Sequence, residues 1–413
     1  MMSSLVFWLL KRLFLFSVYF AIQVFLYKRT LLFFSEPAGD EKRRKRVTAW
    51  VRAFFIGISL PLLLQVSPES RAELPKLLVV LLLYPLEIWM PSSMFIFFLL
   101  AGKDALRALT QRTMARRKVE EIAMREPGPA VPSRRDFMRL ASGTLATVPI
   151  AAFTYGMSVS KTNFTIEKVL IPIKELPKSL EGLRICQLTD IHYESFLFPE
   201  DLIYVVNMAN ELSPDLTFLT GDFLTEDRRL AEPFIEVFRS LKAREGIYGC
   251  LGNHEEYTRT QEIFTRGFRK AGIEILRDTM TDLNIRGEKL RLAGINWVGR
   301  TLRAGAVRTI QSTTAQHPTI LLSHQPNMFP IAAAAGIDLT VSGHTHGGQI
   351  AIELGAARIS LSQLVSPFSA GRYTQGHSQL YVSRGIGTIA LPLRINAPPE
   401  VTLIELVRAG RTT

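Results

Sequence analysis

Residues 183–192 read LRICQLTDIH, and this stretch sets the pattern for the C-terminal part of the chain. A short apolar run ends at Leu188, and Asp190 and His192 follow it closely. Apolar runs of this length, when turn residues bound them, are typical of buried strands. The stretch therefore predicts a buried strand whose carboxyl end presents a carboxylate and an imidazole.

The same arrangement recurs further along the chain. Other apolar runs cover residues 216–220, 247–251, 290–295, 319–323 and 339–342. Segments of helical periodicity lie between several of them, at residues 202–212, 234–241 and 263–271. Strands that alternate with helices favour a layered α/β or α+β domain, which we expect to occupy residues 161–413.

Polar residues that can bind metal ions follow these predicted strands. In chain order they are Asp190, His192, Asp222, Asn253, His254, His324, His344 and His346. The chain has only seven histidines, and we interpret the remaining two, His317 and His377, as surface residues. Ligands of α/β sheets gather outside the carboxyl ends of the strands, so residues far apart in sequence can converge there.

The residue types in this set indicate a particular chemistry. Two carboxylates, several imidazoles and one amide oxygen suit two divalent ions of borderline hardness, such as Mn, Fe, Zn or Ni. No thiolate belongs to the set, which argues against a closed structural zinc site. Paired ions about 3.5–4 Å apart clamp a phosphoryl group and supply a nucleophile at neutral pH. The pattern therefore predicts a dinuclear site for phosphoryl chemistry.

The two cysteines, Cys186 and Cys250, both fall inside predicted buried strands. Neither belongs to a CxxC motif or to a dense disulfide pattern. We expect two free buried thiols, although a bridge would form if the two Cα atoms lay within about 7 Å.

The net charge of +12 suggests a nucleic-acid partner until it is divided by region. Residues 1–160 hold 22 basic and 11 acidic side chains, whereas residues 161–413 hold 27 and 26. The basic excess therefore flanks the apolar segments of the N-terminal third, where it acts as a topology signal. We expect no nucleic-acid partner.

Three apolar stretches, at residues 5–27, 53–66 and 77–101, occupy the N-terminal part. A membrane-spanning helix needs about 20 apolar residues, so the second stretch is short and could be re-entrant or interfacial. Residues 1–126 are thus predicted to be a membrane region with two to three transmembrane or re-entrant helices and basic cytoplasmic loops.

Residues 127–160 combine a Pro-rich joint with a segment that resembles a twin-arginine export signal. Arg134-Arg135 precede Phe137 and the moderately apolar run Leu140–Met157. Paired arginines ahead of a membrane helix can also be ordinary positive-inside residues. In both interpretations the chain after Met157 lies on the periplasmic side of a bacterial inner membrane.

The ordered set D-x-H, G-D, G-N-H-E, S-H and G-H-x-H resembles the calcineurin-like metallophosphoesterase superfamily. The strings GHTHGGQ at 343–349 and YVSRGIG at 381–387 resemble its membrane-associated bacterial branch, which is often exported by the twin-arginine route. The resemblance covers about residues 164–407 and implies an α/β/β/α layered sandwich.

The resemblance also implies a role for each residue of the set. Asp190, His192 and His346 would bind the first metal ion, Asn253, His324 and His344 the second, and Asp222 would bridge the two. His254 would be a non-ligand histidine that stabilises phosphoryl charge or protonates the leaving group. Glu255 would orient its neighbours. Arg384 could steady a phosphate, or belong to a salt-bridged turn.

One position departs from the family pattern. Many members have an Asp three residues after the bridging carboxylate, and purple acid phosphatases have a Tyr ligand there. This chain has Thr225 at that position, which argues against the purple acid phosphatase branch.

The sequence as a whole predicts a membrane-anchored phosphoesterase with two divalent ions. Tethering at a bilayer favours a lipid-linked phosphomonoester, phosphodiester or pyrophosphate as substrate. One alternative is an enzyme like the UDP-2,3-diacylglucosamine pyrophosphatases, but their lipid A precursor lies on the cytoplasmic side. Another is a non-catalytic scaffold on the same fold.

Overall fold

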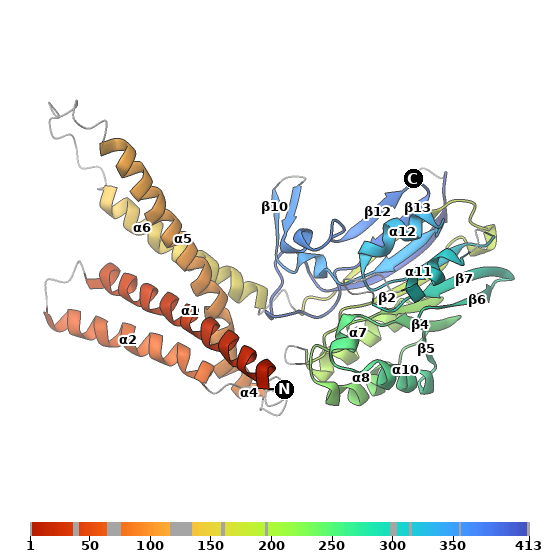
Figure 1. Ribbon diagram of the computed structural model, residues 1–413, viewed down its shortest axis with the longest axis horizontal. Coiled ribbons are helices and arrows are strands. Elements are labelled where there is room, and N and C mark those ends of the chain that lie inside the picture. Colours follow the sequence, from red (N-terminus) through yellow and green to blue (C-terminus); the bar gives the residue numbers. More distant parts are fainter. Residues whose placement is uncertain are drawn as a thin grey trace. The chain divides into compact units, whose positions relative to one another are not determined.

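The computed structural model describes residues 2–35, 41–63, 76–115, 134–157, 162–194, 197–297, 304–313, 316–354 and 357–410. The described chain divides between Tyr155 and Gly156 into two compact units. The first unit is helical, and the second contains all the strands (Figure 1).

The described part of the helical unit consists mainly of long helices. Its elements are α1 (Met2–Ser35), α2 (Glu41–Leu63), α4 (Lys76–Leu78), the π-helical η1 (Val79–Leu83), α5 (Tyr84–Ala115) and α6 (Arg134–Tyr155). Ile22, Phe55 and Ile96 belong to an apolar core shared by α1, α2 and α5. Gln23 is buried in this unit, where it accepts a hydrogen bond from Trp89 Nε1 (2.8 Å) and donates one to Ser93 Oγ (3.0 Å).

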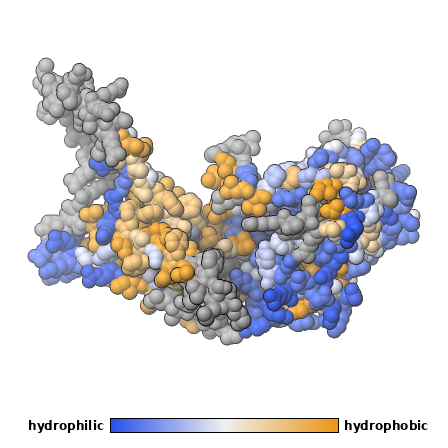
Figure 2. All heavy atoms as spheres, viewed as in Figure 1, coloured by the Kyte–Doolittle hydropathy of each residue, from blue (hydrophilic) through white to orange (hydrophobic). Residues whose placement is uncertain are grey.

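Many large apolar side chains of this unit face outward. Phe14, Phe20 and Phe98 are each more than 60% exposed, and apolar residues dominate the visible face of the helices (Figure 2). Segments Leu13–Phe34 in α1 and Leu81–Thr110, which runs from η1 into α5, are long and apolar enough to cross a membrane. The exposed apolar surface is what a lipid-facing helix needs.

The predicted membrane segments compare with these helices in different ways. The first and third apolar stretches each overlap one of the two candidate spans, which begin and end several residues further along the chain. The second stretch lies partly in α2, and the run Leu140–Met157 forms most of α6, but neither helix is among the candidate spans of the described chain. Ala, Ser, Thr and Gly make α6 less apolar than a typical span. The Pro-rich joint at 127–132 lies outside the described residues.

The second unit contains two six-stranded sheets. The first sheet has the order β1 (Thr165–Ile173), β14 (Glu400–Arg408), β2 (Arg184–Leu188), β3 (Leu216–Thr220), β4 (Gly246–Cys250) and β5 (Ile273–Ile275). The second has the order β12 (Gly371–Gln375), β13 (Ser378–Val382), β9 (Leu339–Ser342), β8 (Thr319–Leu322), β7 (Glu288–Gly294) and β6 (Thr279–Ile285). Strands β2 to β5 are mutually parallel, as are β7, β8, β9 and β13.

Helices cover the outer face of each sheet. The first sheet carries α7 (Pro199–Glu211), α8 (Ala231–Phe238) and α10 (Gln261–Lys270), and the second carries α11 (Ala304–Gln311) and α12 (Phe329–Ala334) (Figure 1). Between the sheets, Phe218 and Ile185 from the first meet Leu322 and Val341 from the second. The layers are therefore α/β/β/α, as predicted.

Side-chain alternation in the strands explains this layering. Ile185 belongs to the core between the sheets, whereas the next residue, Cys186, belongs to the core beneath the helices. Successive residues of a strand point to opposite faces, so a strand buried on both sides is apolar throughout.

Cys186 and Cys250 are both free and buried, as expected, and burial raises the pKa of the Cys186 thiol to about 12.

A small antiparallel hairpin stands apart from both sheets. Its strands are β10 (Ala351–Leu354) and β11 (Ala357–Ser360), and Ile352 pairs with Ile359 across it. The 3₁₀ helices η6 (His346–Gly348) and η7 (Leu361–Leu364) flank the hairpin in the chain.

Candidate metal centre

Five parallel strands deliver the expected ligand residues to one place. Asp190 and His192 follow β2, Asp222 follows β3, and α9 (Asn253–Tyr257) begins just after β4. His324 follows β8 in the second sheet, and His344 and His346 follow β9. The side chains form three groups whose ligand atoms lie within 4.8 Å of one another: Asp190, His192 and His346; Asp222, His324 and His344; and His192, Asp222 and His254.

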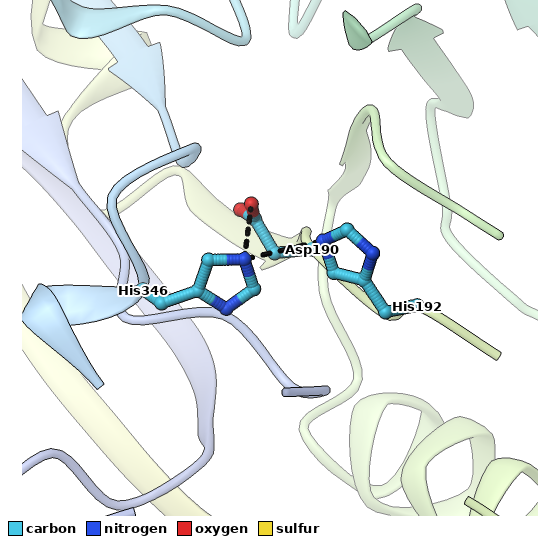
Figure 3. Close-up of side chains that lie close together, drawn as sticks. All are labelled: Asp190, His192 and His346. Carbon is cyan, nitrogen blue, oxygen red and sulfur yellow. Dashed lines mark hydrogen bonds and ion pairs between the residues drawn. The ribbon is translucent and has the colours of Figure 1, made fainter. Parts of the chain in front are cut away.

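The first group joins the two sheets. His346 Nε2 lies 3.1 Å from His192 Nε2 and 3.4 Å from Asp190 Oδ1 (Figure 3). All three side chains are buried. Two imidazole nitrogens and a carboxylate oxygen that converge in this way could hold a divalent ion.

The second group is centred on Asp222. His324 Nε2 lies 3.0 Å from Asp222 Oδ2 and 3.2 Å from His344 Nδ1. The same Oδ2 atom is 3.6 Å from His192 Nε2 of the first group. Asp222 therefore belongs to the second group and also lies beside His192 of the first group, which is where a bridging carboxylate would be placed.

Asn253 provides a further indication of a cation. Its Oδ1 atom is buried and has no hydrogen-bond partner among the described residues. A buried carbonyl oxygen without a partner is costly, and a bound cation would satisfy it. The donor set therefore fits two divalent ions, in agreement with the sequence prediction.

The backbone at the ligand positions is unusual. Positive φ angles occur at Asp190 (50°), His192 (47°), Asp222 (55°), His344 (71°) and His346 (52°). Residues other than glycine rarely adopt this conformation, and it is concentrated at functional sites where the surrounding structure enforces it. The turns after the strands are therefore held in conformations that aim these side chains inward.

Two glycines allow the strand ends to approach each other. A Cβ atom at Gly343 would collide with the carboxylate of Asp190, and one at Gly252 would collide with that of Asp222. Each glycine thus leaves space for a carboxylate from a neighbouring strand end.

The charge states suit metal binding. Burial lowers the pKa of His192 and His346 well below the usual value, and burial together with His324 lowers that of His344 to about 4. These imidazoles are therefore neutral at neutral pH, which is the form that binds metal. His324 is different: burial lowers its pKa, but the charges of Asp222 and Asp190 and the hydrogen bonds to Asp222 and Thr220 together outweigh burial and raise it to about 10.

Glu255 lies behind Asp222 and is fully buried. Its carboxylate accepts hydrogen bonds from the backbone N–H groups of Gly252 (2.7 Å), Phe223 (2.8 Å) and Asp222 (3.0 Å). Burial and the charge of Asp222 raise its pKa to about 7. Glu255 thus ties together the turns that follow β3 and β4.

His254 faces the cluster in a defined tautomer. Its Nδ1–H donates to the carbonyl oxygen of Thr225 at 2.6 Å, because a carbonyl can only accept. Nε2 is therefore the ring nitrogen that this hydrogen bond leaves unused. Its backbone N–H also donates to Asp222 Oδ1 (2.9 Å), which fixes the residue beside the second group.

Thr225 has a positioning role that the sequence did not reveal. Besides holding His254, its hydroxyl lies 3.3 Å from His192 Nδ1. At the position where many family members have an Asp, this residue thus orients two histidines. The contact to His254 uses a backbone carbonyl, which leaves no signal in the sequence.

Arg384 pairs with two carboxylates that do not belong to the three metal-binding groups. Its guanidinium forms ion pairs with Glu167 (2.9 Å) and Glu400 (3.1 Å). This arrangement favours the salt-bridged turn over the phosphate-binding role.

His317 and His377 belong to none of the three groups.

A different arginine, Arg394, supports the site and was missed. It is fully buried, and its guanidinium donates to the backbone carbonyls of Ala397 (2.8 Å), Arg384 (3.0 Å), Gly385 (3.1 Å) and Gly387. The N–H of Gly387 in turn donates to the carbonyl of Asp190 (2.7 Å). Arg394 therefore fixes the loop that braces the first group, and burial lowers its pKa to about 9.

Comparison with known proteins agrees with this geometry. Residues 183–348 match the calcineurin-like phosphoesterase family. A transmembrane protein with a metallophosphoesterase domain from Danio rerio is 32% identical over 62% of this chain and 60% of its own length. The uncharacterized metallophosphoesterase YkuE of Bacillus subtilis is 28% identical over 66% of this chain and 97% of its own length.

The Escherichia coli phosphodiesterase YaeI is also similar, with 28% identity over 67% of this chain and 99% of its own length. The similar region thus spans nearly all of the two bacterial proteins but less than two thirds of the fish protein. The C-terminal unit of this chain thus carries a calcineurin-like phosphoesterase domain at residues 183–348, and it is similar to a bacterial metallophosphoesterase and to a bacterial phosphodiesterase.

Proposed function

We propose that this chain is a membrane-anchored phosphoesterase that uses two divalent ions and acts on a lipid-linked phosphate ester. The observation that carries the proposal is the pair of three-residue groups joined by the single carboxylate of Asp222. Asp190, His192 and His346 are assigned to one ion, and Asn253, His324 and His344 to the other. Mn, Fe, Zn and Ni all suit this donor set.

The chemistry follows from the residues around the pair. When bound, two such ions polarise a phosphoryl group and provide a nucleophile from water. His254 Nε2 stabilises charge on the phosphoryl oxygens and, when protonated, gives its proton to the leaving oxygen. Hydrogen bonds to Thr225 and Asp222 keep His254 in place, and Glu255 keeps Asp222 in place. Arg384 has no part in this mechanism.

Two features support a lipid-linked substrate. The helical unit provides two candidate spans in the same chain. In the catalytic unit, Ile352, Ile359, Leu364 and Val365 are all more than half exposed. The segment that carries them lies against the ligand loop, since a Cβ at Gly348 would collide with Ser360. This apolar hairpin surface, Ile352–Val365, is suited to acyl chains.

Hydrolysis of nitrophenyl phosphates by the purified full-length protein with Mn²⁺ tests the catalytic assignment. Asp222→Asn is expected to lower the rate about 10³-fold, because it removes the shared ligand. His254→Ala is expected to lower it about 10²- to 10⁴-fold without changing the metal content. Asp282→Asn, a change on β6, is the control. Equal rates for wild type, Asp222→Asn and His254→Ala would mean a non-catalytic scaffold.

A pair of phosphodiesters with the same headgroup, one with acyl chains in mixed micelles and one without, tests the substrate class. We expect the acylated ester to have the higher kcat/KM, and Ile352→Ser with Ile359→Ser to remove most of that advantage. A preference that the double variant leaves unchanged would exclude the hairpin surface. No preference in the wild type would exclude a lipid-linked substrate.

We further propose that the catalytic unit lies on the periplasmic side of a bacterial inner membrane, as the basic loops favour. A reporter fused after Val407 tests this. Activity of a reporter that works only in the cytoplasm would overturn the placement.

A further inference from the structure

A row of aromatic rings leads outward from His254. The His254 ring contacts His192 on one side, with centroids 4.7 Å apart, and Tyr257 on the other at 5.5 Å. Tyr257 in turn contacts Trp297, with centroids 5.4 Å apart and ring planes inclined at 78°. The row therefore begins at the metal-binding groups and ends at an indole.

The two outer rings come from different layers of the fold. Tyr257 is one turn after His254 and ends α9, beside the first sheet. Trp297 follows β7 of the second sheet. The pair therefore forms at the same junction of sheets as the metal-binding groups.

Tyr257 is accessible, and Trp297 is partly accessible. Tyr257 is 61% exposed and Trp297 is half-buried. Neither residue belongs to an apolar core cluster of the described chain. Large aromatic side chains that are exposed next to a buried polar site are typical of binding surfaces.

The charge of the pair suits a phosphate ester. Burial, together with the charges of Asp222 and Glu256, raises the pKa of Tyr257. The phenol is therefore neutral at neutral pH, and the indole carries no charge. Neither ring repels the anionic group that the metal-binding groups would hold.

We propose that Tyr257 and Trp297 form a subsite for the leaving group and that they select a leaving group with a flat ring. The inference rests on the proposed function, because a leaving oxygen that receives its proton from His254 must lie on the His254 side. A ring attached to that oxygen reaches Tyr257 first and Trp297 next. An aromatic ring or the apolar face of a sugar ring would pack there, whereas a short alkyl group would leave both rings uncovered.

Binding of two phosphonates tests the subsite without turnover. We would titrate phenylphosphonate and methylphosphonate into the Mn²⁺-loaded full-length protein by calorimetry. Wild type is expected to bind the phenyl compound about 5- to 10-fold more tightly, as contact with aromatic rings allows. Tyr257→Leu and Trp297→Leu are each expected to lower this ratio to below about 2-fold. Tyr257→Phe is expected to restore most of it.

Tyr204→Leu is the matched control, because Tyr204 is also exposed (55%) and also contacts another ring, that of Phe164. It should keep the wild-type ratio. A wild-type ratio near one, or a ratio that Tyr257→Leu and Trp297→Leu leave unchanged, would overturn the subsite. A loss of the ratio in Tyr204→Leu as well would also overturn it.

Kinetics separate this inference from the proposed function. With phenyl and trifluoroethyl methyl phosphodiesters, Tyr257→Leu should raise KM for the phenyl ester about 5- to 10-fold with kcat nearly constant, and raise KM for the trifluoroethyl ester much less. Equal increases for both esters would contradict the subsite while leaving the phosphoesterase intact. A wild type that hydrolyses neither ester would contradict the phosphoesterase, and the phosphonate ratio would still decide the subsite.

Discussion

The two sheets of the catalytic unit contribute different chemistry to the same centre. The first sheet supplies the oxygen atoms of the centre, on Asp190, Asp222 and the amide of Asn253, together with the imidazoles of His192 and His254. The second sheet supplies only imidazoles, His324, His344 and His346. Neither sheet alone provides all the residues that are proposed to hold either ion.

Contacts across the sheets show how the two contributions are kept together. The backbone N–H of His344 donates to both oxygens of Asp190, at 3.0 and 2.9 Å. His324 Nδ1–H donates to the carbonyl of Thr220 at 2.7 Å. Histidines of the second sheet are therefore oriented by atoms of the first, so the centre depends on the register between the sheets.

The largest effect is expected from removing one ligand from either sheet. Asp190→Asn and His346→Ala change different sheets but the same group, so each should lower the bound Mn²⁺ from two ions to one and the rate about 10³-fold. Metal content by mass spectrometry, with Asp282→Asn as control, measures this. Two ions retained by His346→Ala alone would mean that the first sheet holds its ion without the second.

A smaller effect is expected where the sheets touch. Gly343→Ala places a methyl group against the Asp190 carboxylate, so Mn²⁺ affinity should fall about 10- to 100-fold, as for other changes that displace a ligand. Gly102→Ala in α5, at a site with nothing within 4 Å and without a positive φ angle, is the control for a changed glycine. Unchanged affinity, measured by calorimetry, would show that the two strand ends can separate without harm.

A variant at Gln187 measures how much the hydrogen bonds between the two sheets contribute to the stability of the fold. Its buried amide donates to Thr220 Oγ1 (2.8 Å) and to the carbonyl of Ser342 in the second sheet (2.9 Å). Gln187→Met should lower the free energy of unfolding by about 1 kcal/mol, since hydrogen bonds of this kind are lost. Urea unfolding measures it, and the exposed Gln375→Met should change it by less than about 0.5 kcal/mol.

The smallest expected effect is on how the free energy of unfolding changes with pH. The change has opposite signs for one carboxylate near each sheet. Arg229 lowers the pKa of Asp227, after β3, so its stabilisation is present above the unfolded value of 3.8 and is lost as the pH falls through the folded pKa. Burial raises the pKa of Asp338, before β9, so its protonated form stabilises the fold in acid and this stabilisation is lost as the pH rises through the folded pKa.

Asn variants at these two positions measure the difference. Asp227→Asn should cost more free energy of unfolding at about pH 7 than at about pH 3, whereas Asp338→Asn should cost less at about pH 7. The change at Asp227 should stay below about 1 kcal/mol, because its exposed partner Arg229 is screened by water. The same sign for both variants would contradict these assignments.

Much of this molecule could be predicted before its fold was known. The apolar runs predicted β2, β3, β4, β7, β8 and β9, and the periodic segments predicted α7, α8 and α10. Strands buried on both faces have a continuous apolar signal, which makes them easy to find. The strands β1, β5, β6, β12, β13 and β14 of the two sheets were not predicted as strands, and β6 and β12 have exposed or half-buried residues along most of their length.

The sequence by itself determined which residue types follow each strand, because a motif such as GNHE or GHTH is local and needs only its own turn. The superfamily and the α/β/β/α layers followed from the order of those motifs. Only the tertiary structure decided that Asp222 is shared by two groups, that Thr225 and Arg394 hold the site, and that Tyr257 meets Trp297. These contacts join residues on different strands or use backbone carbonyls, so they depend on how two sheets pack together and leave no local pattern in the chain.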